Sequence, residues 1–163
     1  MIPSDHFVRF YNEVFKYISS KGKAELEKYY DRVSKNQEYH CLEDFRTKKL
    51  QGVYEYYLKI RKEENCDLDL ERSEHCLLLR MNHCPSLTKA MDNDAGLCKK
   101  YCLHCPGWTI PLYRKAGLFQ IFAVMGLEDP RCCEWIFEEK SRAEEKYQEL
   151  LSSFPEDQLL KNF

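Results

Sequence analysis

The sequence predicts an α+β fold with a helical N-terminal half, a small antiparallel sheet of about four strands and a helix near the C-terminus. Apolar residues recur at helical spacing through residues 1–64, and they alternate with polar residues in short runs within 65–138. A charged helical pattern returns over 139–152. The length of 163 residues is typical of a single domain. We expect residues 153–163 to form a tail.

The N-terminal half is expected to hold three helices. The first has one expected buried face of apolar residues at i, i+3, i+4 and i+7 spacing, namely Phe7, Phe10, Tyr11, Val14, Phe15 and Ile18. Gly22 marks a break after it. A second helix is predicted over about 23–33 and a third over 37–64, interrupted or bent near Gly52.

The sheet is predicted from four apolar runs. Alternation begins at Cys66 and continues to residue 71, and the second run covers 76–81, which together indicate a β-hairpin. Runs at 118–124 and 133–137 are expected to complete the sheet. The Cys-rich segment lies between these two halves, where Cys105-Pro106-Gly107 predicts a loop or short helix.

The charge balance and the hydropathy of the sequence limit the partners and the compartment that we expect. Lysine plus arginine number 25 against 27 acidic residues, so a formal charge of -2 gives no broad reason to expect nucleic acid or an anionic membrane as partner. No run approaches the roughly 20 apolar residues that span a bilayer, and the N-terminus lacks a signal-peptide pattern. We therefore expect a cytoplasmic protein whose 9 cysteines stay reduced.

The most informative local pattern is a cluster of cysteines. Cys98, Cys102 and Cys105 form a Cys-x3-Cys-x2-Cys motif, and Cys84 lies upstream as a fourth thiolate. Four thiolates can hold a [4Fe-4S] cluster or a tetrahedral zinc ion. The spacing therefore predicts a metal centre at these four residues.

The spacing favours iron-sulfur over zinc. Structural zinc sites commonly draw on two short ligand pairs, whereas only Cys102 and Cys105 form such a pair here. Pro106 follows Cys105, as a proline does in many ferredoxin-like runs. His83 and His104 are further candidate ligands if the metal is zinc.

Two other interpretations of the cysteines stay open. They could be ordinary buried residues, because free cysteine often behaves as a small hydrophobe. Alternatively, Cys84 or Cys102 could be a thiolate nucleophile whose pKa is lowered by nearby histidines and lysines. Cys132 and Cys133 lie in a predicted strand, so their side chains should point to opposite faces and only one can reach the site.

The region from Leu77 to Phe137 contains a further pattern, made of Arg80-Met81-Asn82-His83-Cys84-Pro85, Cys98, Tyr101-Cys102, Gly126 and Asp129 to Phe137. In these residues it resembles the L-2-amino-thiazoline-4-carboxylic acid hydrolase-like family of bacterial proteins. The resemblance implies hydrolysis of a small sulfur- and nitrogen-containing heterocycle, with Cys84 and Cys102 as the catalytic candidates. Cys105 and the doubled Cys132-Cys133 depart from the family pattern and favour a metal-binding variant.

A third function class is a non-enzymatic ligand sensor or scaffold. The N-terminal half is rich in tyrosines, whose polar-tipped rings suit a pocket wall or an interface as well as a core. They are Tyr29, Tyr30, Tyr39, Tyr54, Tyr56 and Tyr57. A small-molecule ligand or substrate and a homo-oligomer are therefore both compatible with the sequence, and enzymatic activity is left open.

Overall fold

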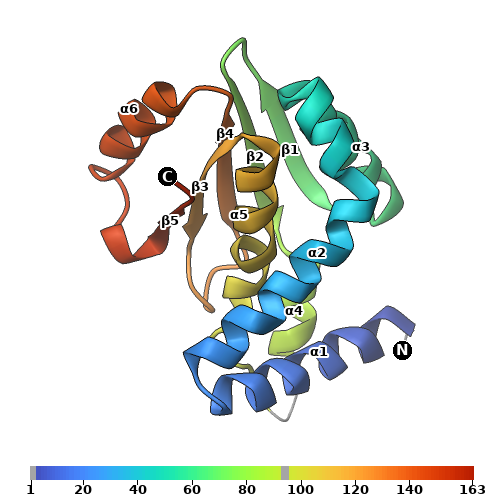
Figure 1. The fold of residues 1–163 in the computed structure, drawn as a ribbon. Coiled ribbons are helices and arrows are strands. Elements are labelled where there is room, and N and C mark those ends of the chain that lie inside the picture. Colours follow the sequence, from blue (N-terminus) through green and yellow to red (C-terminus); the bar gives the residue numbers. More distant parts are fainter. Residues whose placement is uncertain (1–2, 93–95) are drawn as a thin grey trace.

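The computed structural model describes residues 3–92 and 96–163 and confirms the α+β fold (Figure 1). Its helices are α1 (Pro3–Ser20), α2 (Lys23–Lys48), α3 (Leu50–Glu63), α4 (Pro85–Met91), α5 (His104–Ala116) and α6 (Lys140–Leu150), with 3-10 turns at Tyr101–Leu103 and Glu156–Gln158. Its strands are β1 (Asp67–Arg72), β2 (Cys76–His83), β3 (Phe119–Val124), β4 (Cys132–Phe137) and β5 (Leu159–Lys161). Within these described residues, no helix is long and apolar enough to cross a membrane.

The sheet is antiparallel throughout and has the strand order β1-β2-β4-β3-β5. Both predicted hairpin halves are confirmed, because β1 pairs with β2 and β3 pairs with β4. The sheet has one strand more than the about four predicted, because residues 159–161 of the expected tail form β5, which pairs with β3. Asn162 fastens this last segment: its Nδ2 donates to the Leu118 carbonyl at 2.9 Å and its Oδ1 accepts from the Gln120 N–H at 2.9 Å.

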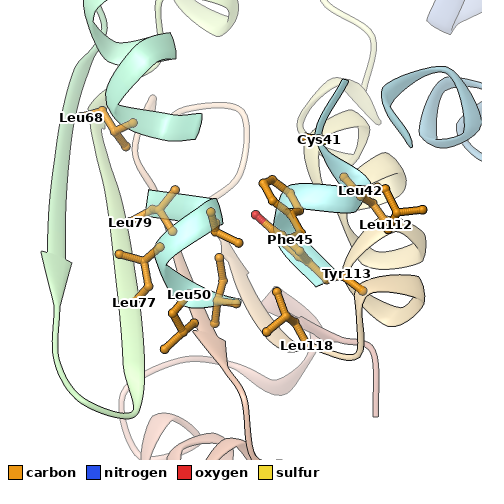
Figure 2. Packing of buried hydrophobic residues seen from close by; sticks show 13 residues of the cluster. Cys41, Leu42, Phe45, Leu50, Leu68, Leu77, Leu79, Leu112, Tyr113 and Leu118 are labelled. Atoms are coloured by element: carbon orange, nitrogen blue, oxygen red, sulfur yellow. The ribbon is translucent and has the colours of Figure 1, made fainter. Parts of the chain in front are cut away.

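Strand alternation divides the core between two faces of the sheet. We call the side toward α2, α3 and α5 the helix face and the opposite side the α6 face. Figure 2 shows Leu77 and Leu79 of β2 directed toward Phe45 of α2 and Tyr113 of α5 on the helix face. The α6 face buries Ile121, Ala123, Trp135 and Phe137 with Ala143, Tyr147 and Leu150 of α6.

The predicted break between residues 33 and 37 is wrong, whereas the interruption predicted near Gly52 is present three residues earlier, at Lys49. α2 continues without a break to Lys48, and the chain turns at Lys49, which adopts a positive φ of 53°. Gly52 lies inside α3 and allows a close approach instead of a bend. A Cβ atom there would lie 2.4 Å from the backbone oxygen of Asp44, so α2 and α3 can pack this closely only around glycine.

The Cys-Pro-Gly sequence begins a helix of 13 residues, α5, although it predicts a loop or short helix. Pro106 is tolerated because it lies in the first turn, where the backbone N–H groups have no partner within the helix. Gly107 is required by packing: a Cβ there would meet the ring of Tyr30 at 2.6 Å. Cys105 therefore occupies a rigid helical turn.

The predicted buried face of α1 is mostly exposed. Phe15 is buried and Ile18 is half-buried, but Phe7, Phe10, Tyr11 and Val14 face solvent. The helix is instead anchored by Asn12, whose Nδ2 donates to the Gly96 carbonyl at 2.7 Å and whose Oδ1 accepts from the Cys98 N–H at 2.8 Å. The helical period of the apolar residues does not show which of them pack against the rest of the protein and which face solvent.

Candidate metal centre

A small cavity of about 30 Å³ lies at the end of the sheet where β2 and β3 finish and β4 begins. Cys84, Cys102, Cys105 and Cys132 line this space, which we call the thiol cavity. The remaining wall residues are Leu87, Tyr101, His104, Phe122, Val124, Met125, Pro130 and Arg131. Four thiols from three separate stretches of sequence thus meet in a mostly apolar pocket.

Each cysteine is held by a different local structure. Cys84 follows β2 and is the N-cap of α4, where its Sγ accepts from the Leu87 N–H at 3.4 Å. Cys102 belongs to the 3-10 turn, and Cys105 to the first turn of α5. Cys132 is the first residue of β4. The antiparallel register brings Cys132 opposite Met81 and Val124, close to the ends of β2 and β3.

The loop between β3 and β4 closes one side of the cavity. The Cys84 N–H donates to the Pro130 carbonyl at 2.7 Å, which ties this loop to the start of α4. Arg131 donates to both carboxylate oxygens of Asp129, at 2.8 Å through Nε and 2.7 Å through Nη2. The loop therefore places a positive charge, itself oriented by a carboxylate, at the edge of the cavity.

Three of the four predicted ligands come together, and Cys98 does not join them. Cys98 is buried with Phe15 and Leu26, its N–H donates to Asn12, and its Sγ lies 3.8 Å from Ser19 Oγ. It packs α1 against the segment before the 3-10 turn and does not line the cavity. The fourth thiol of the cavity is Cys132, which lies 27 residues beyond Cys105 in the sequence.

The vicinal pair Cys132-Cys133 divides between the two faces, as strand alternation predicts. Cys132 lines the thiol cavity, whereas Cys133 packs with the core of the α6 face and hydrogen-bonds Arg80. The prediction that only one of the two can reach the site is confirmed. Strand alternation shows that only one of the two cysteines can reach the cavity. Which of them it is depends on which face of β4 lies toward α5.

The thiols hold their protons strongly. Burial raises the pKa of Cys102 and of Cys105 to about 12, and it raises the pKa of Cys132 further and that of Cys84 less. Neighbouring thiols add to the effect at Cys102, because Cys84 and Cys105 lie close to it. The expectation that nearby bases lower the pKa of Cys84 and Cys102 is therefore wrong: desolvation of the anion dominates.

Of the two candidate histidines, His104 lines the cavity. Its Nδ1 lies 2.9 Å from the Tyr101 carbonyl, which assigns the proton to Nδ1 and leaves Nε2 3.4 Å from Cys105 Sγ. Burial lowers the pKa of His104, so its ring is neutral beside the thiol. His83 instead lies outside the cavity, with Nε2 3.0 Å from Thr88 Oγ1.

The donor types fit a thiophilic metal, but the thiols do not converge on a single point. Zinc requires all four sulfurs about 2.3 Å from one centre. In residues 3–92 and 96–163, no group of three or more His, Cys, Asp or Glu side chains is arranged so that it could hold one metal ion. All 9 cysteines are free thiols, so the four in the cavity are available to a metal without breaking a disulfide.

No protein-family model, curated protein or solved structure matches this chain. The resemblance to the L-2-amino-thiazoline-4-carboxylic acid hydrolase-like family therefore stays a prediction.

Proposed function

We propose that the protein binds an iron-sulfur cluster through Cys84, Cys102, Cys105 and Cys132. The observation that supports this most directly is the convergence of four free thiols on one small cavity. Four cysteine sulfurs are the usual ligand set of a [4Fe-4S] cluster. Two of them form the Cys-x2-Cys pair Cys102/Cys105, and the other two come from the ends of neighbouring strands.

The ligand spacing favours a cluster over zinc, because structural zinc sites commonly draw on two short ligand pairs and only Cys102 and Cys105 form such a pair here. In a [4Fe-4S] cube each iron takes one protein sulfur, so the four sulfurs surround the cluster and need not share one ion. The thiols line the wall of the cavity without forming a group that could hold one ion. Zinc bound by the same four residues is the alternative, and it would require the thiols to close on one point.

The surroundings suit a cluster of low solvent access, but the cavity of about 30 Å³ has room for about one water, so its wall must open to admit a cube of four irons and four sulfides. Tyr101, Phe122, Val124 and Met125 supply an apolar wall, and such a shell controls the dielectric around a metal site and hence its potential. When bound, a cluster of this kind supplies one-electron transfer. The thiols hold their protons in the metal-free protein, so binding of the cluster must release protons. Retention of the cluster should therefore weaken as the pH falls.

The test is metal and sulfide analysis of protein purified and reconstituted without oxygen. We expect stoichiometric iron and acid-labile sulfide, with the broad visible absorption of a cluster. Cys84→Ser, Cys102→Ser, Cys105→Ser and Cys132→Ser should each lose most of the iron. Cys98→Ser and Cys133→Ser are the matched controls, because each changes a cysteine next to the site in sequence but outside the cavity.

The outcomes separate the alternatives. Protein without stoichiometric iron after reconstitution overturns the cluster. One zinc per chain that is lost in the same four variants would establish zinc in its place. Iron that depends on Cys98 and not on Cys132 would restore the ligand set that the sequence motif predicts and contradict the one proposed here.

Hydrolysis of a small sulfur- and nitrogen-containing heterocycle is the second candidate, favoured by the family resemblance and by the presence of Cys84 and Cys102 in one cavity. Their raised pKa values count against a thiolate nucleophile in the metal-free protein. The test is turnover of a 2-aminothiazoline-4-carboxylate substrate. Activity that is unchanged in both Cys84→Ser and Cys102→Ser would remove these residues as nucleophiles.

A further inference from the structure

One side of α1 presents large apolar side chains to solvent. We call these residues the α1 stripe; they and their exposed fractions are Phe7 59%, Phe10 67%, Tyr11 50%, Val14 39% and Tyr17 65%. Monomeric proteins rarely leave apolar patches of more than a few hundred Å² uncovered. A row of this kind on one helix therefore needs an explanation beyond the fold of a single chain.

The stripe is not used by the fold. α1 already packs through its other side, where Phe15 is buried and Asn12 bonds to Gly96 and Cys98. At 100° per residue, the side that carries Asn12 and Phe15 is turned well away from the side that carries Phe10 and Val14. Figure 1 shows α1 at the rim of the molecule beside α2 and α4, with its N-terminal end projecting past them.

The spacing of the stripe matches the seam of a helix pair. Phe7, Phe10, Val14 and Tyr17 follow one another at intervals of three, four and three residues, which is the a/d spacing of a coiled coil. The intervals are the same in both directions along the chain. In an antiparallel pair of identical helices, Phe7 would therefore lie opposite Tyr17 of the other copy, and Phe10 opposite Val14.

The area is close to that of a dimer interface. With about 200 Å² for each large side chain, the four seam residues expose roughly 450 Å² per chain, and Tyr11 beside the seam brings this to roughly 550 Å². Two copies would thus bury at most roughly 1,100 Å² from the stripe, near the ~1,000 Å² expected of a specific interface. Polar residues along the edges of the helix would add to this value.

The charges beside the stripe favour a second copy over an anionic membrane. Membrane-surface helices carry lysine and arginine on the polar face. Here Lys16 forms an ion pair with Glu13 at 2.7 Å, and Lys21 lies over the ring of Tyr17 with Nζ 4.9 Å from its centroid. The flank therefore carries both signs of charge and resembles the polar border of a protein interface.

We propose that the α1 stripe is a homodimer interface, in which α1 of two chains pair antiparallel about a two-fold axis near residue 12. The contact is isologous, so it closes after two copies and predicts dimers instead of filaments. The thiol cavity lies outside the stripe, and the proposal does not depend on the metal centre.

Sedimentation equilibrium in the micromolar range tests the proposal. Wild-type protein should be a dimer, and Phe10→Glu should be a monomer with the wild-type circular-dichroism spectrum, because residue 10 contributes little to the fold of one chain. The melting temperature should depend on protein concentration in the wild type and not in Phe10→Glu, because dimerisation stabilises the folded chain by mass action. Tyr39→Glu is the matched control: Tyr39 is 90% exposed on α2, outside the stripe, and its change should leave the dimer intact.

The antiparallel register has its own test. Val14→Lys alone should also weaken the dimer, but an equal mixture of Phe10→Glu and Val14→Lys chains should restore it, because the carboxylate introduced at position 10 then meets the ammonium introduced at position 14. A wild-type monomer throughout the micromolar range overturns the proposal, as does a dimer that survives Phe10→Glu. A monomer that cosediments with anionic vesicles would assign the stripe to a membrane surface and likewise overturn it.

Discussion

The two faces of the sheet share the same strands but differ in what they bury. The α6 face is filled by apolar residues such as Ile121, Trp135 and Phe137. The helix face also has an apolar centre, but beside it lie a carboxyl, a carboxamide and a hydroxyl group: Glu134 is 5% exposed, Gln120 0% and Thr109 1%. Only the helix face leads to the thiol cavity, which Cys132 enters two residues before Glu134.

The buried polar groups form one network. Gln120 Nε2 donates to Glu134 Oε1 at 2.6 Å and to Thr109 Oγ1 at 2.8 Å, and Tyr113 also hydrogen-bonds Glu134. Gln120 Oε1 has no hydrogen-bond partner among the described residues, which is unfavourable for a buried acceptor. The α6 face is thus apolar where the helix face carries a buried polar network close to the thiols, and such a network is sensitive to any change in its partners.

The largest effect expected from this comparison is on the α6 face. Trp135→Ala should lower the free energy of unfolding by about 3 to 4 kcal/mol, because it removes a large side chain that is 8% exposed and packs edge-on to Phe154. Urea unfolding followed by circular dichroism measures the change. Trp135→Phe keeps part of the packing and should lose clearly less; a loss below about 1 kcal/mol in Trp135→Ala would contradict the assignment of this face.

The second prediction concerns the helix face and depends on pH. Burial raises the pKa of Glu134 to about 8, so the folded protein keeps a proton that the unfolded chain releases. The stability that this proton provides is complete below the unfolded pKa and is lost as the pH rises toward 8. In metal-free protein the loss should approach ~1.4 kcal/mol per pH unit, or on the order of 2 kcal/mol between pH 6.5 and 8.

Glu134→Gln is the matched variant for this prediction. It should flatten the dependence of unfolding free energy on pH in the same window. The window starts at pH 6.5 because the lowered pKa of His104 acts in the opposite direction below it, where the unfolded chain gains the proton. The raised pKa values of the thiols act in the same direction as that of Glu134 and begin to contribute about one pH unit below the ordinary thiol pKa of ~8.5. The difference between wild type and Glu134→Gln therefore isolates the contribution of Glu134. A wild-type stability that rises between pH 6.5 and 8 would contradict a protonated Glu134.

The difference between the faces also explains what the sequence could and could not predict. Alternation and helical period give the strands and most helices correctly, because packing on both faces follows those periods. They fail at β5, a strand of 3 residues held by the side chain of Asn162. These sequence patterns also fail to predict α5, because they do not show that Gly107 lies inside a helix and packs against the ring of Tyr30.

Only the part of the candidate site that lies within one short stretch of sequence was predictable. Cys102 and Cys105 lie on adjacent turns, so their spacing places both at one cavity. Cys98 belongs to the same motif, four residues before Cys102, but its N–H donates to Asn12, 86 residues away, and it packs in a different cluster. Cys132 enters the cavity through the pairing of β4 with β2 and β3, which no local pattern specifies.

The third prediction tests the contact that supports the helix face. Gly107→Ala should destabilise the protein by about 2 kcal/mol, because the new Cβ would meet the Tyr30 ring at 2.6 Å. In a Tyr30→Leu background the same change should cost less, since the smaller side chain can move aside. Equal effects in both backgrounds, measured by urea unfolding as a double-mutant cycle, would show that the ring contact is not the cause.

The smallest effect is expected at β5, which belongs to the α6 face through Leu159 and Phe163. Asn162→Ala removes two hydrogen bonds to the backbone around β3 and should lower stability by about 1 kcal/mol. Amide exchange should quicken first in residues 159–161, because the strand loses its anchor while β3 keeps its pairing with β4. Equal acceleration across the whole sheet would mean that Asn162 supports the global fold, and that β5 is as much a part of the α6 face as β3 and β4 are.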